Sequence, residues 1–250
     1  MTDAIAPSPW LDAKLVDVLA MEAGMREIVL DVDDWPGHLA GQHVDVRLPG
    51  GGRWDRPHSY SIANAHGAAM DPPTRVHIAV SAELVSGIGP GTSLKIDGPK
   101  GDRMAWTPEQ TGDRPLLLIA GGTGIIPLMA IAYTWAAQPS RAPLRVIYSV
   151  RSLRQRLCVD DMALLAVEDG ASVTWIVTGT GSPARASGSS GRITARDLEL
   201  FGLPPADGPE CFVCGSPSFV ESVAGLLSSA GHPASRIRTE WEIPLMGGVA

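Results

Sequence analysis

Cysteine is scarce in this sequence, which has only Cys158, Cys211 and Cys214 among its 250 residues. An odd number of cysteines cannot pair completely, so we do not expect a disulfide framework. Iron–sulfur clusters are usually held by four thiolates, so a cluster within this chain is not expected either. Cys211 and Cys214 form a C-x-x-C pair, but no second pair and no paired histidines follow. Because "ECFVCG" has the pattern of a buried strand, we favour core cysteines over a redox dithiol or half a zinc site, and we predict no metal.

Long apolar runs and an excess of basic residues are also missing. No segment approaches the ~18 apolar residues needed to cross a bilayer. The first residues, "MTDAIAPSPW", lack the basic and apolar regions of a secretory signal, so we expect a cytoplasmic protein without membrane insertion. The sequence has 20 Lys and Arg against 27 Asp and Glu, a formal net charge of −7. This balance argues against sequence-independent binding to nucleic acid, although it allows a small basic patch for a phosphorylated ligand.

The sequence does contain two halves with different patterns. From residue 12 to 108, short apolar runs such as "REIVLDV", "HVDVRL" and "RVHIAV" are separated by turn residues, and several alternate with period two. This pattern is typical of an antiparallel barrel or sandwich. After "WTPEQTGDRP", compact strands alternate with helix candidates at 127–138, 160–170, 194–202 and 217–232, which predicts a parallel sheet covered on both faces. We therefore expect a boundary near 107–114, with one domain at 1–110 and a second at 111–250.

A glycine-rich turn follows the first strand of the second half. In "LLLIAGGTGIIPLMAIA" the strand ends at Ala120, and Gly121, Gly122, Thr123 and Gly124 lead into a helix near Pro127. Glycine lets the backbone turn sharply and approach a ligand, proline suits the first helical turn, and exposed N–H groups there bind a pyrophosphate. The turn could also be a tight connection without a ligand. Its place at the first strand of a parallel sheet favours a nucleotide.

Five segments in order resemble the ferredoxin–NADP reductase superfamily, and more closely its short bacterial flavin-binding oxidoreductases. They are "AGQHVDV", "SYSIAN", "GGTGIIPLMA", "YSVRS" and "CFVCGSPSFV", and the resemblance covers nearly the whole chain. It implies a six-stranded antiparallel β-barrel that carries FAD, or FMN in some branches. It also implies a Rossmann-like α/β domain with a parallel sheet for NADPH or NADH.

The resemblance assigns flavin-binding roles to the strand around residue 60. Tyr60 would pack its ring along the flavin, and Ser61 would hydrogen-bond near N5. The family pattern places a phosphate-binding arginine where this chain has His58. Arg56 lies two residues earlier, on the same side of an extended strand, so we expect flavin to be bound with either Arg56 or His58 in the phosphate role. The alternative for Tyr60 is an ordinary cross-strand aromatic residue. The alternative for Arg56 and His58 is that both side chains are solvated at the end of a strand. The predicted contacts of this segment are Arg56, His58, Ser59, Tyr60, Ser61 and Ile62.

A shortened segment, "VHIAVSAELVSGIGPG", replaces the hairpin after which the family has a Val-Ser pair that opens a short helix over the flavin pyrophosphate. Two pairs fit this position, Val80-Ser81 and Val85-Ser86. We favour Val80 and Ser81, because "AELVSGIG" then preserves the helix length and ends at glycine. Either serine could cap that helix.

The resemblance also assigns the nicotinamide side of the site. Cys214 would face the nicotinamide, Gly215 would allow close approach, and Glu240 would lie beside the flavin. Trp241 could stack on the ring or could be a core residue. Arg151 is one candidate to bind the nucleotide's 2′-phosphate. The family often has a Thr-Arg pair after the third strand, but this chain has Thr178-Gly179, so Arg185 or Arg192 could take the place of the missing arginine. We favour NADPH slightly over NADH.

The resulting hypothesis is an NAD(P)H-dependent flavoprotein reductase. It would take hydride onto FAD and pass electrons to a separate protein acceptor, a ferredoxin, a flavodoxin or an oxygenase component. Hydride transfer between two rings requires positioning rather than a nucleophile, so Ser61, Cys214 and Glu240 would be positioning groups. The alternatives are a flavin- or nucleotide-binding module without redox turnover and a non-redox enzyme on the same scaffold.

Overall fold

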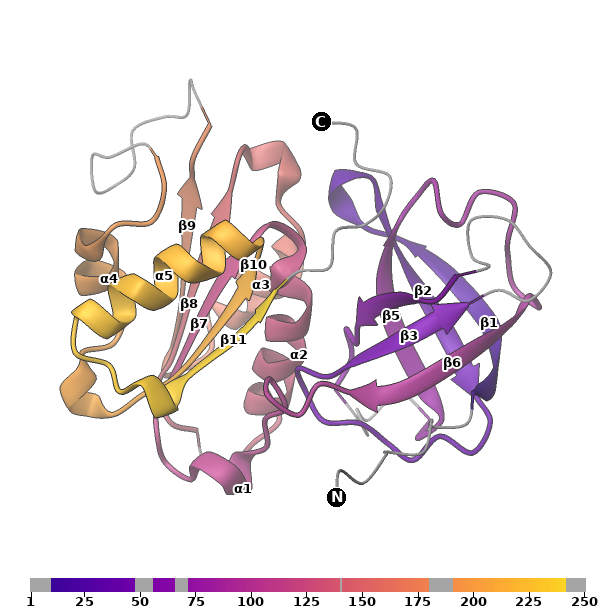
Figure 1. The fold of residues 1–250 in the computed structure, drawn as a ribbon, viewed down its shortest axis with the longest axis horizontal. Coiled ribbons are helices and arrows are strands. Elements are labelled where there is room, and N and C mark those ends of the chain that lie inside the picture. Colours follow the sequence, from indigo (N-terminus) through magenta and orange to yellow (C-terminus); the bar gives the residue numbers. More distant parts are fainter. Residues whose placement is uncertain (1–9, 48–55, 66–71, 140, 180–190, 242–250) are drawn as a thin grey trace, which may run out of the picture.

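The computed structural model describes residues 10–47, 56–65, 72–139, 141–179 and 191–241. It shows two lobes side by side, each built on its own sheet (Figure 1). We call the part with strands β1 to β6 the N-terminal lobe and the part with strands β7 to β11 the C-terminal lobe. Among the described residues, no helix is long and apolar enough to cross a membrane.

The N-terminal lobe is a six-stranded sheet in the order β4-β3-β6-β1-β2-β5, and every neighbouring pair is antiparallel. Ile62, which follows edge strand β4, forms an isolated bridge with Ile78 of the other edge strand, β5. The predicted six antiparallel strands are therefore confirmed, whereas the described residues show no continuous ladder that would close them into the predicted barrel. The strands are β1 (Leu11–Ala20), β2 (Met25–Val32), β3 (His43–Arg47), β4 (His58–Ser61), β5 (Arg75–Ser81) and β6 (Ser93–Lys100).

Alternation along these strands separates a core from an outer face. Val44 and Val46 of β3 are buried in the lobe's apolar core, and Tyr60 of β4, which is paired with Val44, joins them. His43 and Asp45 lie on the opposite face of the same strand, because successive side chains point to opposite sides of a sheet. The outer face of β3 is thus polar, and His43 is the β3 residue that lies at the cleft between the lobes.

The C-terminal lobe is a five-stranded sheet in the order β11-β10-β7-β8-β9, and all four neighbouring pairs are parallel. The chain moves outward from β7 through β8 to β9, then returns to the other side of β7. The switch point between β7 and β10 is where such sheets bind ligands, at the carboxyl ends of the strands. The strands are β7 (Leu116–Gly121), β8 (Leu144–Val150), β9 (Ala171–Val177), β10 (Glu210–Gly215) and β11 (Ile237–Trp241).

Helices cover both faces of this sheet, as the strand–helix alternation predicts. Residues of α2 and α3 share a buried cluster with one face of the sheet, and residues of α4 and α5 share another with the opposite face. The α-helices are α1 (Pro108–Thr111), α2 (Ile125–Ala136), α3 (Val159–Leu165), α4 (Ala195–Phe201) and α5 (Pro217–Ser229). Short 3₁₀ turns are η1 (Glu22–Gly24), η2 (Gly122–Gly124), η3 (Leu153–Gln155), η4 (Pro205–Asp207) and η5 (Ala234–Arg236).

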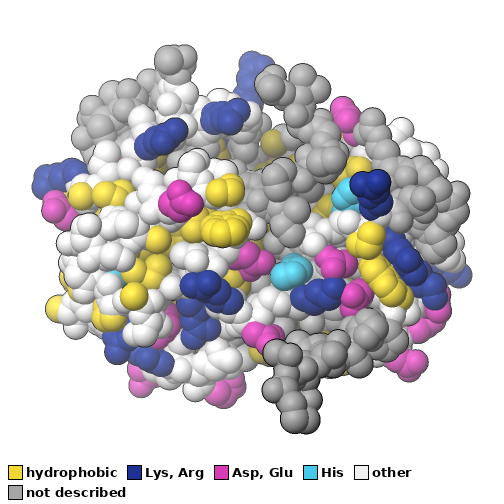
Figure 2. Space-filling view, viewed as in Figure 1, with side chains coloured by type: hydrophobic (Ala, Val, Ile, Leu, Met, Phe, Trp, Pro, Cys, Tyr) yellow, Lys and Arg dark blue, Asp and Glu magenta, His cyan; other side chains and the backbone are white. Residues whose placement is uncertain are grey.

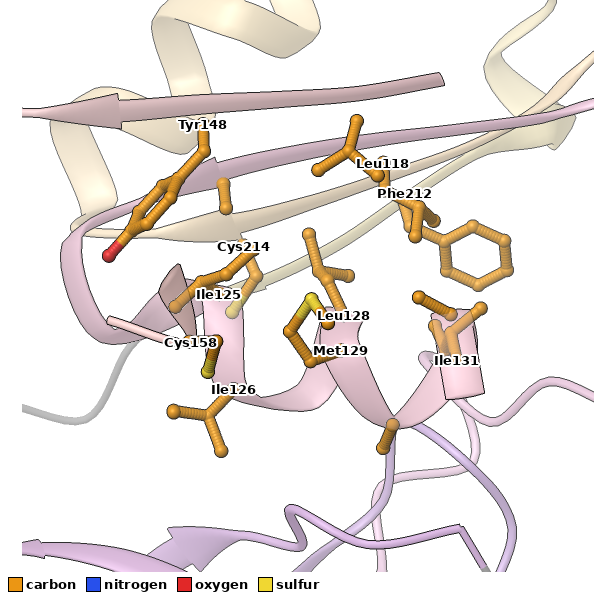
Figure 3. Close-up of a cluster of buried hydrophobic side chains, with 14 of the residues drawn as sticks. Leu118, Ile125, Ile126, Leu128, Met129, Ile131, Tyr148, Cys158, Phe212 and Cys214 are labelled. Carbon is orange, nitrogen blue, oxygen red and sulfur yellow. The ribbon is translucent and has the colours of Figure 1, made fainter. Parts of the chain in front are cut away.

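Helix α2 is the element that joins the two lobes. Leu118 and Phe212 of the sheet share a buried cluster with Leu128 and Met129 of this helix. Ile126 lies on the side of the helix that faces away from the sheet (Figure 3). The same buried cluster includes residues of the N-terminal lobe, among them Met25. The lobes therefore share an apolar interface around α2, beside the switch point.

Residues 101–115 connect the two sheets. The Trp106 N–H donates to the Ala40 carbonyl oxygen at 2.9 Å, and Arg238 Nη1 donates to the Ala105 carbonyl oxygen at 2.9 Å. The connection is thus attached to both lobes. The division at residue 110 stays a prediction.

Candidate functional site

The glycine turn lies at the switch point of the parallel sheet. Strand β7 ends at Gly121, Gly122 has a φ of +58°, and α2 begins at Ile125, so Pro127 is the third helical residue. A Cβ on Gly124 would lie 2.4 Å from the Cys214 carbonyl oxygen, and one on Gly121 would lie 2.9 Å from Cγ of the Phe219 ring. Side chains at these two positions would collide with the end of β10 and the start of α5. Glycine is therefore what lets the turn fit there.

A cavity of about 700 Å³ opens over this turn. Its C-terminal-lobe wall includes Gly121–Thr123 and the first turn of α5 from Ser216. Its N-terminal-lobe wall includes Gly24 and Ser81–Glu83. Cavities of 300–1,000 Å³ are the usual size for small-molecule and cofactor sites. Backbone N–H groups at the start of a helix favour an anion, so this wall suits a phosphorylated ligand.

Arginines lie in the wall of this cavity formed by the end of β8 and the segment before α4. Arg151 and Arg192 both line it, together with Gln155 and Thr178. The Gly179 N–H donates to the Arg151 carbonyl oxygen at 2.8 Å, and a Cβ at Gly179 would lie 2.3 Å from the same oxygen. Two of the three arginines predicted for a 2′-phosphate are thus in the cavity. Arg185 lies outside the described residues.

A smaller cleft of about 50 Å³ lies between the lobes and shares Met25 and Thr123 with the large cavity. Both lobes contribute to its lining, which places the predicted residues of the flavin side beside those of the nicotinamide side. It is lined by Met25, His43, Ser59, Tyr60, Ser61, Ala79, Thr123, Gly124, Ile126, Cys214, Glu240 and Trp241.

The sheet aligns the residues on the C-terminal side of this cleft. Cys214 is paired with Ala120 of β7 and with Glu240 of β11, so all three lie in one row at the carboxyl ends of the strands. The Cys214 thiol is buried and is not part of a disulfide. Oε1 of Glu240 lies 3.1 Å from Nδ1 of His43, which belongs to the other lobe. A contact between a histidine and a carboxylate thus crosses the cleft.

The two aromatic residues of the cleft differ in exposure. Tyr60 is 4% exposed, and burial raises the pKa of its phenol above the usual range, so the ring is neutral and fixed. Trp241 is 61% exposed, so it is not a core tryptophan. Of the two roles considered for Trp241, only stacking on a ligand stays a prediction.

The chain is similar to several proteins of known class. Residues 118–225 match the oxidoreductase NAD-binding domain family. The chain is 28% identical over 221 residues to the reductase subunit of an aromatic O-demethylase from Amycolatopsis, which covers 85% of this chain and 63% of that protein. It is 27% identical over 238 residues to ferredoxin–NADP reductase B of Sorangium cellulosum, covering 92% of this chain and 96% of that one. A crystal structure of an Amycolatopsis cytochrome P450 reductase matches with a TM-score of 0.77 and 25% identity, over 98% of this chain and 74% of that chain.

The chain is thus similar in sequence and fold to ferredoxin–NADP reductase-like oxidoreductases. The predicted resemblance and the predicted pair of antiparallel and parallel sheets are confirmed. The chain spans less than two thirds of the length of the O-demethylase reductase subunit. The ligands and activity of this chain are therefore proposed below from its own residues.

The residues predicted for the flavin phosphates lie outside the linings of both cavities. Arg56 is exposed just before β4, and His58 is half-buried at the start of β4, opposite Val46. Neither lines the cleft or the large cavity. The side chains of Ile62 and Val80 are fully buried in the core, so only their backbone could contact a ligand.

The helix predicted after Ser81 is absent. Residues 82–87 form successive turns, in which the Leu84 N–H donates to the Ser81 carbonyl oxygen at 3.0 Å and the Ile88 N–H to the Val85 carbonyl oxygen at 3.2 Å. Neither serine caps a helix there. Ser81 nevertheless lines the large cavity, whereas Ser86 is exposed and lines neither cavity, so the cavity favours the Ser81 register.

His43 is the residue that sequence reasoning missed. It lies inside the "AGQHVDV" segment, and alternation places it on the outer face of β3. Its pairing with Ser61 brings it to the cleft. That cross-strand pairing was the missing information, because the sequence pattern alone does not say which outer-face residue of β3 lies next to the second lobe.

Proposed function

We propose that this chain is an NAD(P)H-dependent flavoprotein reductase, which takes hydride from a nicotinamide onto FAD and passes electrons to a separate protein acceptor. The observation that carries the proposal is the shared cleft, where Tyr60 and Ser61 of one lobe lie with Cys214 and Glu240 of the other. Its relatives, an O-demethylase reductase subunit and a ferredoxin–NADP reductase, support the same reaction class. The names of these relatives favour a ferredoxin or an oxygenase component as the acceptor, and a flavodoxin is a further candidate.

A nicotinamide dinucleotide fits the large cavity. The glycine turn and the start of α5 offer N–H groups for the pyrophosphate, and Gly124 brings the turn against Cys214. Arg151 and Arg192 line the same cavity and offer the bidentate geometry that a 2′-phosphate requires. We therefore favour NADPH over NADH.

The residues that line the small cleft are of types that suit a flavin, but the cleft itself is narrow. An aromatic ring, a hydroxyl, a thiol and a carboxylate surround the cleft, yet its 50 Å³ holds a few water molecules rather than a three-ring system. Side chains at its mouth must move to admit the ring, and exposed Trp241 is the first candidate. The large cavity, which extends to Ser81–Glu83, has room for an adenosine diphosphate group and so favours FAD over FMN.

Bound FAD would supply the chemistry by accepting a hydride and releasing electrons singly. The chain's own residues bind, orient and exclude water. Ser61 and Glu240 would fix the edge of the ring, and Cys214 would hold the nicotinamide against it. Close stacking of the reacting atoms, at ~3–3.5 Å, is what such positioning provides, and no nucleophile is needed.

The test is to purify the chain with FAD and add NADPH or NADH without oxygen. We expect a yellow protein whose flavin colour is bleached, faster with NADPH than with NADH. A cytochrome or ferredoxin added afterwards should restore the colour. A protein that binds neither FAD nor nicotinamide nucleotide would contradict the proposal.

A second candidate function is a nucleotide-binding module without redox turnover. The narrow cleft and the distance of Arg56 and His58 from both cavities favour it, because both features weaken flavin binding. Nucleotide binding with no bleaching of added FAD would support this candidate. A cytoplasmic location stays a prediction.

A further inference from the structure

A short contact between a histidine and a carboxylate crosses the small cleft between the two lobes. Nδ1 of His43, on β3, lies 3.1 Å from Oε1 of Glu240, on β11. The two side chains are 22% and 23% exposed, so water screens the pair only in part. Because β3 and β11 belong to different sheets, this contact links the lobes at the place where both rings would meet.

The N-terminal lobe holds the His43 ring in place. His43 is paired with Ser61 on one side and with Lys100 on the other, at an irregularity in the β3–β6 ladder. Gly101 follows with a φ of +92°, and a Cβ there would lie 2.6 Å from Nδ1 of His43. The imidazole therefore lies against the backbone at Gly101. A histidine in this position is directed to the cleft by its surroundings.

The Glu240 side chain is long and flexible by nature, so its position depends on what it contacts. Its backbone is fixed beside Cys214 by the β10–β11 ladder. A glutamate loses rotamer freedom when it is held in one conformation, so a fixed position requires a contact that offsets this loss. The His43 ring provides the contact that holds the carboxylate toward Ser61 and Cys214, which line the same cleft.

We propose that His43 is a positioning residue for hydride transfer: it holds the Glu240 carboxylate in the cleft and joins the two lobes around the reacting rings. The proposal rests on the proposed function above for its catalytic consequence. The pairing itself does not depend on it. His43 does not act on the substrate and exchanges no electrons with it.

Two substitutions separate the polar contact from ring packing. His43→Phe keeps a planar ring of similar size but removes the polar nitrogen that faces Glu240, whereas His43→Gln keeps a polar N–H group but removes the ring. A matched control is His77→Phe, since His77 of β5 pairs with Glu27 of β2 at 2.6 Å within one lobe and lines neither cavity. All variants are measured as FAD-loaded full-length chains.

For hydride transfer, His43→Phe should lower kcat on the order of tenfold while KM for the nucleotide changes less than about twofold, because misplacing a positioning group affects the transition state most. His43→Gln should recover most of this loss, and His77→Phe should match the parent. If His43→Phe kept the parent's kcat and His43→Gln lost it, packing of the ring rather than the contact with Glu240 would explain the role of His43, and the proposal would be overturned. Equal activity of both variants and the parent would overturn it too.

Thermal unfolding without any cofactor tests the pairing independently. His43→Phe and Glu240→Gln should each lower Tm by about 1–3 °C, and the double variant should lower it no further than one of them. Additive shifts would contradict the pairing. If the parent chain binds no flavin yet the shifts are not additive, the pairing holds and the proposed function is what fails.

Discussion

Gly124 shows how a single residue sets the distance between two strand ends at the site. Its φ is −59°, a backbone conformation that any residue adopts, so conformational freedom is not what requires glycine there. The requirement is space, because a Cβ would lie 2.4 Å from the Cys214 carbonyl oxygen and 2.7 Å from the Gly215 nitrogen. Both atoms belong to backbone that is fixed in a parallel ladder. These backbone atoms therefore cannot move away without disturbing the strand pairing.

Gly124→Ala should destabilise the chain by about 1–3 kcal/mol, the usual cost of forcing extra atoms into a packed site. It should also weaken nucleotide binding, because the turn must move away from β10. Gly225→Ala is the matched control, since a Cβ at Gly225 meets nothing within 4 Å. In the interior of α5 that change should stabilise by up to ~1 kcal/mol. Urea unfolding and nucleotide titration measure both effects, and equal results for the two variants would contradict the account.

Asp45 is the centre of a polar network on the outer face of the N-terminal lobe. Ser59 donates to Asp45 through its hydroxyl, and Lys100 Nζ donates to Oδ2 of Asp45 at 2.6 Å and to Asp97 at 2.7 Å. Burial raises the pKa of Asp45, but the hydrogen bonds from Lys100 and Ser59 and the lysine charge outweigh it, so the pKa lies below its usual value. The ionised carboxylate therefore stabilises the fold.

The sign of the pH dependence follows from this shift. A carboxyl whose pKa is lower in the folded state stabilises the fold at pH values above its pKa in the unfolded chain, which is ~3.9. This stabilisation is lost as the pH falls through the lower pKa of the folded state. Asp45→Asn should therefore lower stability by about 1 kcal/mol at neutral pH after allowing for solvent screening, and the difference should vanish in acid. Asp12→Asn, at an exposed pair with Lys95, should change little at any pH. Urea unfolding from pH 7 downward checks this, and a difference that grows in acid would refute it.

At the scale of elements, Glu210 ties three segments together at the start of β10. Oε1 of Glu210 lies 3.0 Å from Nη1 of Arg114, which follows α1, and Oε2 lies 3.6 Å from Nε of Arg238 on β11. The Glu210 side chain is 4% exposed. Arg238 also donates to the Ala105 carbonyl oxygen. The connection between the lobes is thus fastened to the sheet by one buried carboxylate.

Glu210→Gln should cost ~2 kcal/mol, because it replaces the buried carboxylate that pairs with two arginines by a neutral amide while keeping the side-chain volume. Glu199→Gln provides the comparison, since Glu199 pairs with Arg196 at the surface with 67% of its side chain exposed. Exposed pairs contribute ~0–1 kcal/mol, so that variant should unfold at nearly the parent's urea midpoint. Similar losses in the two variants would show that burial does not decide the cost.

Most elements could be predicted from the sequence, and one exception is informative. The parallel sheet and α2, α4 and α5 follow from continuous apolar strands that alternate with amphipathic runs. The predicted helix over "AELVSGIG" is absent, because a segment of eight residues with Gly87 and Gly89 is too short and too rich in glycine to offset the cost of helix nucleation. Predicted helix 160–170 ends early, at Leu165.

At the scale of the whole molecule, the site is made by the meeting of two lobes. The ordered motifs predicted which residues gather there, and Tyr60, Ser61, Cys214 and Glu240 do share one cleft. Neither the width of the cleft nor the His43–Glu240 pair could be predicted. Both depend on how one sheet sits against the other, through packing around α2, and local sequence patterns do not specify that distance. The face in Figure 2 carries charges of both signs interspersed, without an extended single-sign patch among its described residues.

The central claim is that a nicotinamide and a flavin ring are held face to face between the lobes. The most direct measurement is anaerobic stopped-flow bleaching of the FAD-loaded chain by NADPH carrying deuterium on one or the other face of C4. A cleft with one fixed stacking geometry predicts slower bleaching for deuterium on one face only, with that label lost from the nicotinamide. Equal slowing from both faces, or bleaching at the same rate with every label, would contradict the account.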